Sequence, residues 1–416
     1  MLRGAADWLA IPALTRSAAL AQGRCNMREA DVVVLGAGAA GLMCALTAGR
    51  RGRRVVVLDH AAQPGEKILI SGGGRCNFTN LHCAPERFLS ANPHFCRSAL
   101  ARYTPRDFLG MVERHRIAWH EKTLGQLLCD GSARQIVAML LAECAAAGVD
   151  IRLRQRIAEV SRAARFRVET DAGPIEAAAL VLATGGLSIP KLGATGLAYD
   201  LARHFGLELT PICPGLVPLL LGGAELSRLA GLAGVSASVG ASCGKMRFDE
   251  GMVVPHRGLS GPSILQISSV WREGEVVQID LLPKAAKGFL LAYKKSRPKS
   301  GLRGVLGRAL PQRLADAFLP ADEAARPIGE VPDRNLADLE ATLRTWCVTP
   351  TGTEGYAKAE VTLGGIATTA LSQRTMQSNA VPGLFVIGEA VDVTGWLGGY
   401  NFQWAWASGF VAGEVA

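Results

Sequence analysis

The hydrophobic pattern near the start of the chain predicts a strand, a helix and a second strand. Residues 31–35 form a short apolar run, which is typical of a parallel strand buried on both faces. Residues 39–50 then combine alanine, leucine and methionine without proline, and residues 55–58 form a second apolar run. This order predicts a right-handed βαβ unit with parallel strands.

Similar short apolar runs occur further along the chain. Residues 180–182 and 381–387 predict two more buried strands, and residues 403–412 predict a helix. From about residue 211, short apolar segments separated by Gly, Pro and Ser indicate β structure. Residues 302–346 carry leucine and alanine at helical spacing. The pattern therefore predicts a parallel-sheet domain that is interrupted by an insertion.

These patterns divide the chain into three expected domains and a leader. The expected spans are a leader over residues 1–28, a discontinuous parallel-sheet domain over 29–200 and 355–416, an inserted β-rich domain over 201–300 and a helical subdomain over 301–354. The leader has a weakly apolar stretch broken by Pro12 and Arg16, which makes a poor signal-peptide core. Met27 stands just before the first strand, so we expect it to be the natural start.

Composition narrows the class of protein. A chain of 416 residues that is 49% hydrophobic can bury a core and suggests two or three domains. Its ten cysteines include no Cys-x-x-Cys pair, so we expect free thiols and a cytoplasmic location. His82, Cys83, His94 and Cys96 fit no usual zinc spacing, and we expect no metal site. No apolar run approaches the roughly 20 residues that cross a bilayer, so no membrane partner is expected.

The formal net charge of +9 comes partly from two basic stretches, residues 50–54 and residues 284–308. No acidic residue occurs between Leu281 and Ala315. A solvated basic surface is the ordinary interpretation of such stretches. A surface that faces an anionic substrate or RNA is the alternative.

Gly36, Gly38 and Gly41 form a G-x-G-x-x-G pattern between the first predicted strand and its helix. In this context the glycines allow a tight turn, close approach of the backbone to a pyrophosphate, and close helix–strand packing. Asp59 closes the second strand, about 20 residues after the glycines, where a carboxylate can accept hydrogen bonds from ribose hydroxyls. These residues predict a dinucleotide site, but they do not distinguish FAD from NAD.

Three further segments favour FAD. Residues 67–80 supply three successive glycines and then Arg75, a bare backbone that suits a flat ring and a diphosphate, with an arginine to balance phosphate charge. Residues 183–185 end a strand as a second cofactor turn. Residues 387–389 and 398–402 lead into a helix whose N-terminus can face the pyrimidine edge of a flavin.

The expected cofactor-binding residues come from the glycine motif and from these segments. They are Gly36, Gly38, Ala39, Ala40, Gly41, Asp59, Lys67, Ser71, Gly72, Gly73, Gly74, Arg75, Cys76, Asn77, Ile157, Ala183, Thr184, Gly185, Gly388, Glu389, Gly399, Tyr400, Asn401 and Phe402. Cys76 is either a small buried residue, the ordinary interpretation, or a redox thiol. His256 is either a turn residue or a substrate-side proton donor. No acid–base group stands out, so the catalytic residue is left unassigned.

Three segments, residues 71–80, 256–262 and 392–404, resemble the aminoacetone-oxidase-type, BaiN-like family of bacterial flavoproteins. The resemblance extends from Ala30 to the end of the chain. It implies an α/β fold in which a three-layer, glutathione-reductase-type FAD domain with a parallel sheet carries an inserted β-barrel-like domain and a small helical domain. It also implies noncovalent FAD and either amine oxidation or reduction of a conjugated double bond.

The leading hypothesis is an FAD-dependent oxidoreductase that exchanges hydride between flavin N5 and a small or medium organic substrate. No second G-x-G-x-x-G unit is present, so NAD(P)H is a candidate electron donor that would visit the same flavin. Nucleic acid is not the expected partner. The alternatives are an FAD-dependent tRNA-modifying or RNA-binding flavoprotein and a non-catalytic flavin-binding protein. The substrate and the oligomeric state are left open.

Overall fold

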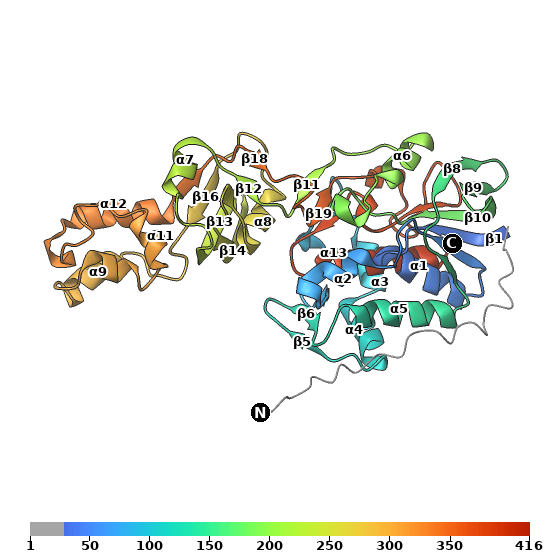
Figure 1. Ribbon diagram of the computed structural model, residues 1–416, viewed down its shortest axis with the longest axis horizontal. Helices are drawn as coiled ribbons and strands as arrows, with labels where there is room; N and C mark the ends of the chain where they lie inside the picture. The colour runs from blue at the N-terminus through green and yellow to red at the C-terminus, as the bar shows by residue number, and fades with distance from the viewer. Residues whose placement is uncertain (1–28) are drawn as a thin grey trace, which may run out of the picture.

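A computed structural model describes residues 29–416, and the expected leader and the expected start at Met27 lie outside the described residues. Figure 1 shows a large body that contains both ends of the described chain and an arm that projects from it. Helices α9 and α12 lie at the far end of this arm. Two separate hydrophobic clusters match these parts, one in the body and one spanning Leu219 to Val348.

A seven-stranded sheet forms the centre of the body. Its strands are β7 (Asp150–Arg152), β2 (Val55–Leu58), β1 (Glu29–Leu35), β10 (Ile175–Leu182), β9 (Phe166–Thr170) and β8 (Ile157–Arg162) in that order, with β20 (Leu384–Val386) beside β10. The β1 strand pairs in parallel with both β2 and β10, and β20 also runs parallel to β10. The predicted βαβ unit and parallel sheet are therefore confirmed, while β8 and β9 add an antiparallel extension.

Helices α1 (Ala39–Arg50) and α13 (Tyr400–Gly413) pack against each other, and α5 (Arg134–Ala146) packs on α1. Glycine permits the close approach of the first two helices. A Cβ on Gly409 would lie 2.5 Å from the carbonyl oxygen of Ala40, and one on Gly413 would lie 2.6 Å from that of Cys44. The helix predicted over residues 403–412 is present, but it begins three residues earlier.

Smaller elements complete the body. A three-stranded sheet has the order β3 (Asn77–Asn80), β6 (Gln126–Cys129) and β5 (Trp119–Glu121), and β21 (Thr394–Gly395) pairs with β4 (Phe88–Leu89). The remaining helices are α2 (Glu66–Gly74), α3 (Arg97–Arg102), α4 (Pro105–Arg114), α6 (Leu197–His204) and the short 3-10 turns η1 (Pro85–Arg87), η2 (Pro190–Leu192), η4 (Thr368–Ala370) and η5 (Gly388–Ala390).

The arm is built on short antiparallel strands. One sheet has the order β14 (Met246–Val253), β13 (Ser236–Cys243), β16 (Val277–Asp280) and β17 (Trp346–Val348), and a second has β15 (Gly258–Leu259), β12 (Leu219–Leu220) and β18 (Gly352–Thr353). Its helices are α7 (Gly223–Arg228), α8 (Pro262–Ser268), α9 (Phe289–Ser296), α10 (Leu302–Leu306), α11 (Gln312–Asp316), α12 (Asp333–Arg344) and the 3-10 turn η3 (Ile328–Glu330).

Helices α9 to α12 lie in the chain between β16 and β17, which are neighbouring strands of one sheet. Helix α9 begins at Phe289, and β17 and β18 lie within residues 301–354, the span expected to be helical. The strand that follows the helices completes the sheet because β17 pairs with β16. The division of the chain at residues 200, 300 and 354 remains a proposal.

The chain leaves and re-enters the body through two paired segments. Strand β11 (Cys213–Gly215) runs antiparallel to β19 (Val361–Leu363). Just beyond this pair, the backbone N–H of Glu360 donates to the carbonyl of Leu216 at 3.2 Å. The junction therefore fixes both residues where the arm meets the body.

Candidate functional site

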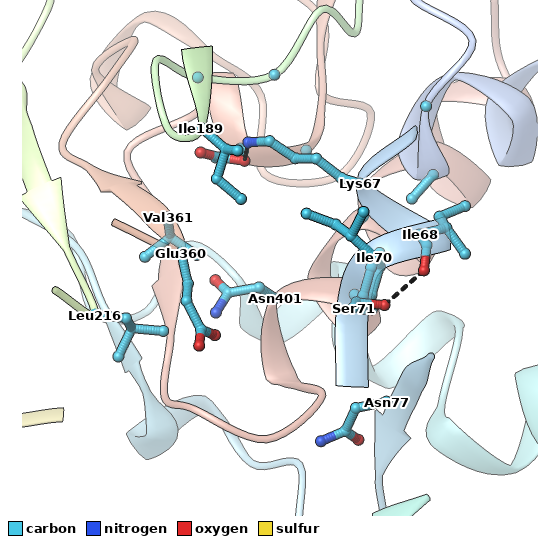
Figure 2. Close-up of a pocket in the computed structure, with 18 of the residues that line it drawn as sticks. Lys67, Ile68, Ile70, Ser71, Asn77, Ile189, Leu216, Glu360, Val361 and Asn401 are labelled. Atoms are coloured by element: carbon cyan, nitrogen blue, oxygen red, sulfur yellow. Dashed lines mark hydrogen bonds and ion pairs between the residues drawn. The ribbon is translucent and has the colours of Figure 1, made fainter. Parts of the chain in front are cut away.

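A cavity of about 1790 Å³ lies along the carboxyl ends of the parallel strands and extends to the arm. Drug-sized ligands occupy pockets of about 300–1,000 Å³, so this cavity has room for a larger cofactor together with a substrate. The carboxyl ends of parallel strands are where open α/β sheets bind nucleotides. Figure 2 shows side chains from the body and the junction converging on this space.

The glycines of the G-x-G-x-x-G motif have two different roles. A Cβ on Gly36, where φ is +111°, would lie 2.4 Å from the carbonyl oxygen of Ala183, and one on Gly41 would lie 1.9 Å from that of Gly36. These two glycines permit close packing between the first turn, α1 and β10. A Cβ on Gly38 meets nothing within 4 Å, and Gly38 lines the cavity at the start of α1. It therefore leaves room for a phosphate at a helix N-terminus.

Asp59 lines the cavity directly after β2. Its Oδ2 accepts a hydrogen bond from the Ala37 N–H at 2.7 Å, and its Oδ1 accepts one from the Ala61 N–H at 2.8 Å. These bonds hold the carboxylate beside the glycine turn. Each carboxylate oxygen has a second lone pair, so Asp59 keeps the capacity to accept from ribose hydroxyls.

The glycine-rich C-terminal part of α2 adopts a broken helical path. Ser71 is extended, with ψ of 151°, and Gly72 and Gly73 have φ of 56° and 67°. A Cβ on Gly73 meets nothing within 4 Å. Bare backbone therefore borders the cavity at Ser71–Gly73, as expected for a segment that passes a flat cofactor.

A charged cluster at the cavity joins α2, near the start of the chain, to η5, near its end. Lys67 Nζ lies 2.7 Å from Glu389 Oε2 and 2.6 Å from Ser188 Oγ. Ser188 Oγ and the Thr362 N–H both donate to Glu389 Oε1, each at 2.9 Å. Burial acts to raise the pKa of Glu389, but the Lys67 charge and these hydrogen bonds outweigh it, so the pKa is lowered. The cluster therefore holds an ionised Glu389.

The start of α13 forms another wall. Gly399 precedes the helix with φ of 95°, and a Cβ there would lie 2.4 Å from the Thr79 carbonyl oxygen. The Asn401 amide accepts from the Gly395 N–H at 2.8 Å and donates to the Gly395 carbonyl at 2.9 Å. The side chain of Asn401 therefore braces the preceding loop. The free N–H groups of the first turn can face negative charge in the cavity.

Glu360 brings an unpartnered carboxyl group to the cavity from the junction (Figure 2). Its side-chain atoms have no hydrogen-bond or ion-pair partner among residues 29–416. Glu360 is exposed to solvent, yet partial desolvation in the cavity raises the pKa of its carboxyl group, and no neighbouring charge lowers it. The charged groups that line the cavity include the Lys67–Glu389 ion pair, Glu250 on β14, whose pKa is raised by burial, and the cations Arg247 and Lys284 from the arm. Glu360 therefore holds its proton more strongly than a free glutamate does.

The cavity gathers most of the expected cofactor-binding residues. Those that line it are Gly36, Gly38, Ala39, Ala40, Asp59, Lys67, Ser71, Gly72, Gly73, Asn77, Ile157, Ala183, Thr184, Gly185, Gly388, Glu389, Gly399, Asn401 and Phe402. The expected residues that do not line it are Gly41, Gly74, Arg75, Cys76 and Tyr400. For the residues that line the cavity, binding to the cofactor remains a proposal. For the five residues that do not line it, the cavity gives no support to that assignment.

Three of these placements have clear physical reasons. Arg75 is exposed outside the cavity, so its expected role as a counter-charge for phosphate is not supported. Cys76 is fully buried, and burial strongly raises the pKa of its thiol, which favours the small buried residue over the redox thiol. His256 is exposed and does not line the cavity, so the structure does not support a proton donor at this position.

Several cavity residues were not expected from the sequence. They are Lys122, Thr123 and Leu124, the loop of Leu192, Gly193, Ala194 and Thr195, and, at the junction or in the arm, Leu216, Ser238, Arg247, Glu250, Lys284 and Glu360. The glycine-containing loop at 192–195 carried a recognisable turn signal. The residues of the arm carry no local motif, because only the fold brings them to the cavity.

Within residues 29–416, no cluster of His, Cys, Asp and Glu is placed to hold a metal ion. No helix in the same residues is long and apolar enough to cross a membrane.

The fold and this site define an FAD-dependent oxidoreductase with a Rossmann-type FAD domain. Its backbone cradle at Gly38, the oriented Asp59 and the start of α13 all fit the cofactor. The model of the HI0933-like protein Rossmann domain matches residues 30–415, and the chain belongs to this family.

Three relatives match nearly the whole chain. The ribosomal RNA dihydrouridine synthase of Escherichia coli (strain K12) is 48% identical over 399 residues, which are 93% of this chain and 98% of the relative. A protein of the same name from Haemophilus influenzae is 45% identical over 91% of this chain and 96% of the relative. The 3-dehydro-bile acid delta(4,6)-reductase of Clostridium scindens is 29% identical over 92% of this chain and 98% of the relative.

Proposed function

We propose that this chain reduces a uridine base of ribosomal RNA to dihydrouridine, with FAD as the hydride carrier. The observation that carries this proposal is the 48% identity to a ribosomal RNA dihydrouridine synthase over 93% of the chain. A match of that extent includes the arm as well as the FAD domain, and the arm supplies part of the substrate side of the cavity. RNA thereby replaces the small organic molecule as the leading substrate.

The chemistry fits the more distant relative too. Dihydrouridine forms when hydrogen adds across the C5=C6 bond of uracil, which is conjugated to a carbonyl group. The relative from Clostridium scindens is named as a reductase of a bile acid, and a conjugated double bond reduced by a flavin is one of the two reactions that the family resemblance implied. Both substrates therefore accept a hydride at one carbon and a proton at its neighbour.

The residues of the cavity divide this task. Reduced FAD supplies the hydride with its two electrons. Gly38, Asp59 and the first turn of α13 bind and orient the cofactor. Glu360 is the best-placed source of the proton, because its carboxyl group points into the cavity without a partner and partial desolvation there raises its pKa. After the transfer, the Glu360 carboxylate recovers a proton from water.

The electron donor is proposed to be NADH or NADPH. The sequence has a single G-x-G-x-x-G unit, so a reduced nicotinamide would visit the flavin from the open side of the same cavity. Donor and RNA would then bind in turn. Such alternation predicts ping-pong kinetics.

The test is anaerobic incubation of the purified protein with NADH or NADPH and ribosomal RNA isolated from cells that lack this enzyme. Nucleoside mass spectrometry should detect new dihydrouridine that depends on both the donor and the protein. A small conjugated enone serves as the second substrate in parallel. If the enone is reduced while the RNA stays unmodified, the protein is a small-molecule reductase and the RNA proposal is wrong.

A further inference from the structure

The arm carries a group of exposed basic side chains that the reduction chemistry does not use. They lie between the end of strand β16 and the residues that follow helix α10, and we call them the basic arm surface: Lys284, Lys287, Lys295, Arg297, Lys299 and Arg308. All six are exposed, and none has a carboxylate within salt-bridge distance among residues 29–416. Their charge is therefore available to an external anion.

Two neighbouring cations, in contrast to these six, have carboxylate partners. Lys294 forms an ion pair with Asp333 at 2.7 Å, and Arg303 forms one with Asp316 at 2.7 Å. Lys294 lowers the pKa of Asp333 by its hydrogen bond and its charge, and the charge of Lys295 lowers it to a smaller extent. One carboxylate thus balances one of two adjacent lysines, and the surplus positive charge remains on the surface.

Three of the four arginines in the other basic stretch of the sequence bind groups of the body itself. Arg50 pairs with Glu143 and Arg54 pairs with Asp31. Arg51 donates to the carbonyl oxygens of Gly413 and Ala416, which are both 3.0 Å away. Residues 50–54 therefore serve mainly to hold the body together, whereas the basic arm surface has no such internal role.

An aromatic ring lies among these cations. The guanidinium groups of Arg297 and Arg308 each lie 5.9 Å from the centroid of the Tyr293 ring. Proteins that bind RNA stack bases on aromatic rings and on arginine planes, and they contact phosphates with Lys and Arg. The arrangement of Tyr293 with flanking arginines is suited to both contacts.

The surface also connects to the cavity. Lys284 lines the cavity, and the rest of the group lies on and around α9, which Figure 1 places at the far end of the arm. A ligand that contacts all of these residues must extend from the cavity to the tip of the arm. A free nucleoside is too small for this, whereas a folded RNA with a regular phosphate backbone has the required size and charge.

We propose that the basic arm surface binds the phosphate backbone of the RNA substrate and directs one base to the cavity. This inference rests on the function proposed above, because it assumes that the substrate is RNA. Phosphate contacts position a nucleic acid without reading its sequence. The arm would therefore govern the affinity for RNA, and the cavity would govern which base is reduced.

The test compares the wild-type holoenzyme with a variant in which Lys287, Lys295 and Lys299 are all changed to Gln. A fluorescent ribosomal RNA fragment reports the Kd at several salt concentrations. Each lost phosphate contact should reduce the slope of log K against log salt by about 0.7–0.9, so the triple variant should lose roughly two units of slope. Its affinity at low salt should fall by at least about tenfold.

Matched controls separate binding from folding. Lys299→Glu and Arg53→Glu change the charge equally at two exposed positions, one on the basic arm surface and one on the body. Only the first should weaken RNA binding. FAD content, melting temperature and the rate of flavin reduction by NADPH should stay at wild-type values in both. An equal Kd and salt slope for wild type and triple variant overturns the inference.

The outcomes also separate this inference from the proposed function. If the triple variant loses RNA affinity while neither protein forms dihydrouridine, the surface stands and the proposed function is wrong. If both proteins bind RNA equally and form dihydrouridine at the same KM, the function stands and the surface is wrong. If the wild type binds no RNA at all, both are wrong.

Discussion

Lys67 and Glu389 are separated by 322 positions in the chain, yet the Lys67 ammonium lies 2.7 Å from the Glu389 carboxylate. The pair joins helix α2 to the turn η5 that follows β20, and thereby links the two segments of the discontinuous FAD domain. Both residues also line the cofactor cavity. The ion pair therefore holds two distant segments of the chain together at the wall of the cavity.

The change Lys67→Met should lower the stability of the protein by about 1–3 kcal/mol, because it leaves an enclosed carboxylate without its cation. Partial exposure of both side chains keeps the effect in this moderate range. Chemical denaturation of the FAD-free protein measures it. The double variant Lys67→Met/Glu389→Gln should recover part of the loss, and a double variant as unstable as the sum of both single variants would contradict the coupling.

The same pair predicts a pH dependence. The folded-state pKa of Glu389 is lowered, so its stabilising contribution is fully present above the unfolded-state value of about 4.3 and is lost as the pH falls through the folded-state value. Glu389→Gln should therefore be less stable than the wild type at neutral pH. The difference should shrink below about pH 4. A difference that does not vary with pH would show that charge is not its source.

Glu360 should behave in the opposite way. Its folded-state pKa is raised, so its contribution to stability is fully present below the unfolded-state value of about 4.3 and is lost as the pH rises through the folded-state value. Glu360→Gln should be at least as stable as the wild type at neutral pH, by a margin that is small because Glu360 is exposed and that disappears near pH 4. Substrate reduction should nevertheless fall by about 10²–10⁴-fold.

Glu354→Gln is the matched control for Glu360, because it makes the same change outside the cavity. It should leave the rate of reduction unchanged. Glu360→Asp should restore part of the activity. If Glu360→Gln reduces substrate at the wild-type rate, another group supplies the proton.

Valine substitutions at two glycines of the same motif should have different effects, one on FAD binding and the other on folding. In Gly38→Val the new side chain enters open cavity, so the FAD-free protein should fold with a nearly normal melting temperature but bind no FAD. In Gly41→Val the new Cβ would lie 1.9 Å from the Gly36 carbonyl oxygen, so the protein itself should be destabilised. Melting temperature and bound FAD per chain distinguish the two. Stoichiometric FAD in Gly38→Val would refute the assignment of the phosphate position.

Asp59→Ala should weaken FAD binding by about 1–3 kcal/mol, because ribose hydroxyls lose a charged acceptor. The backbone N–H groups of Ala37 and Ala61 lose theirs too, so the turn should loosen. Fluorescence titration of the FAD-free protein measures the affinity. An unchanged Kd would mean that another residue holds the ribose.

The sequence predicted the parts of the site that depend on local order. The strand, glycine turn and helix at residues 31–50 follow from a buried apolar run and from the backbone freedom of Gly36, and Asp59 follows from its place after β2. Arg75 could not be placed from its position in the sequence, because the left-handed turn at Gly72 and Gly73 redirects the chain and points it away from the cavity. Spacing alone does not reveal such a turn.

The substrate side was beyond prediction for a different reason. Glu360 belongs to no motif, and it reaches the cavity only because β11 and β19 pair at the junction of arm and body. Lys284 reaches the cavity from the arm in the same way. The basic stretch was visible in the sequence, but its interpretation as a solvated surface or an RNA contact required the ion pairs that distinguish it from residues 50–54.

The most direct test of the central claim is a single-turnover experiment without oxygen. The enzyme is reduced with one equivalent of NADPH and then mixed with ribosomal RNA that lacks dihydrouridine, or with the same RNA already converted by the enzyme. The account predicts that the flavin is reoxidised only by the unmodified RNA, with one dihydrouridine formed for each flavin. A flavin that stays reduced with both RNAs, or that is reoxidised equally by both, would contradict it.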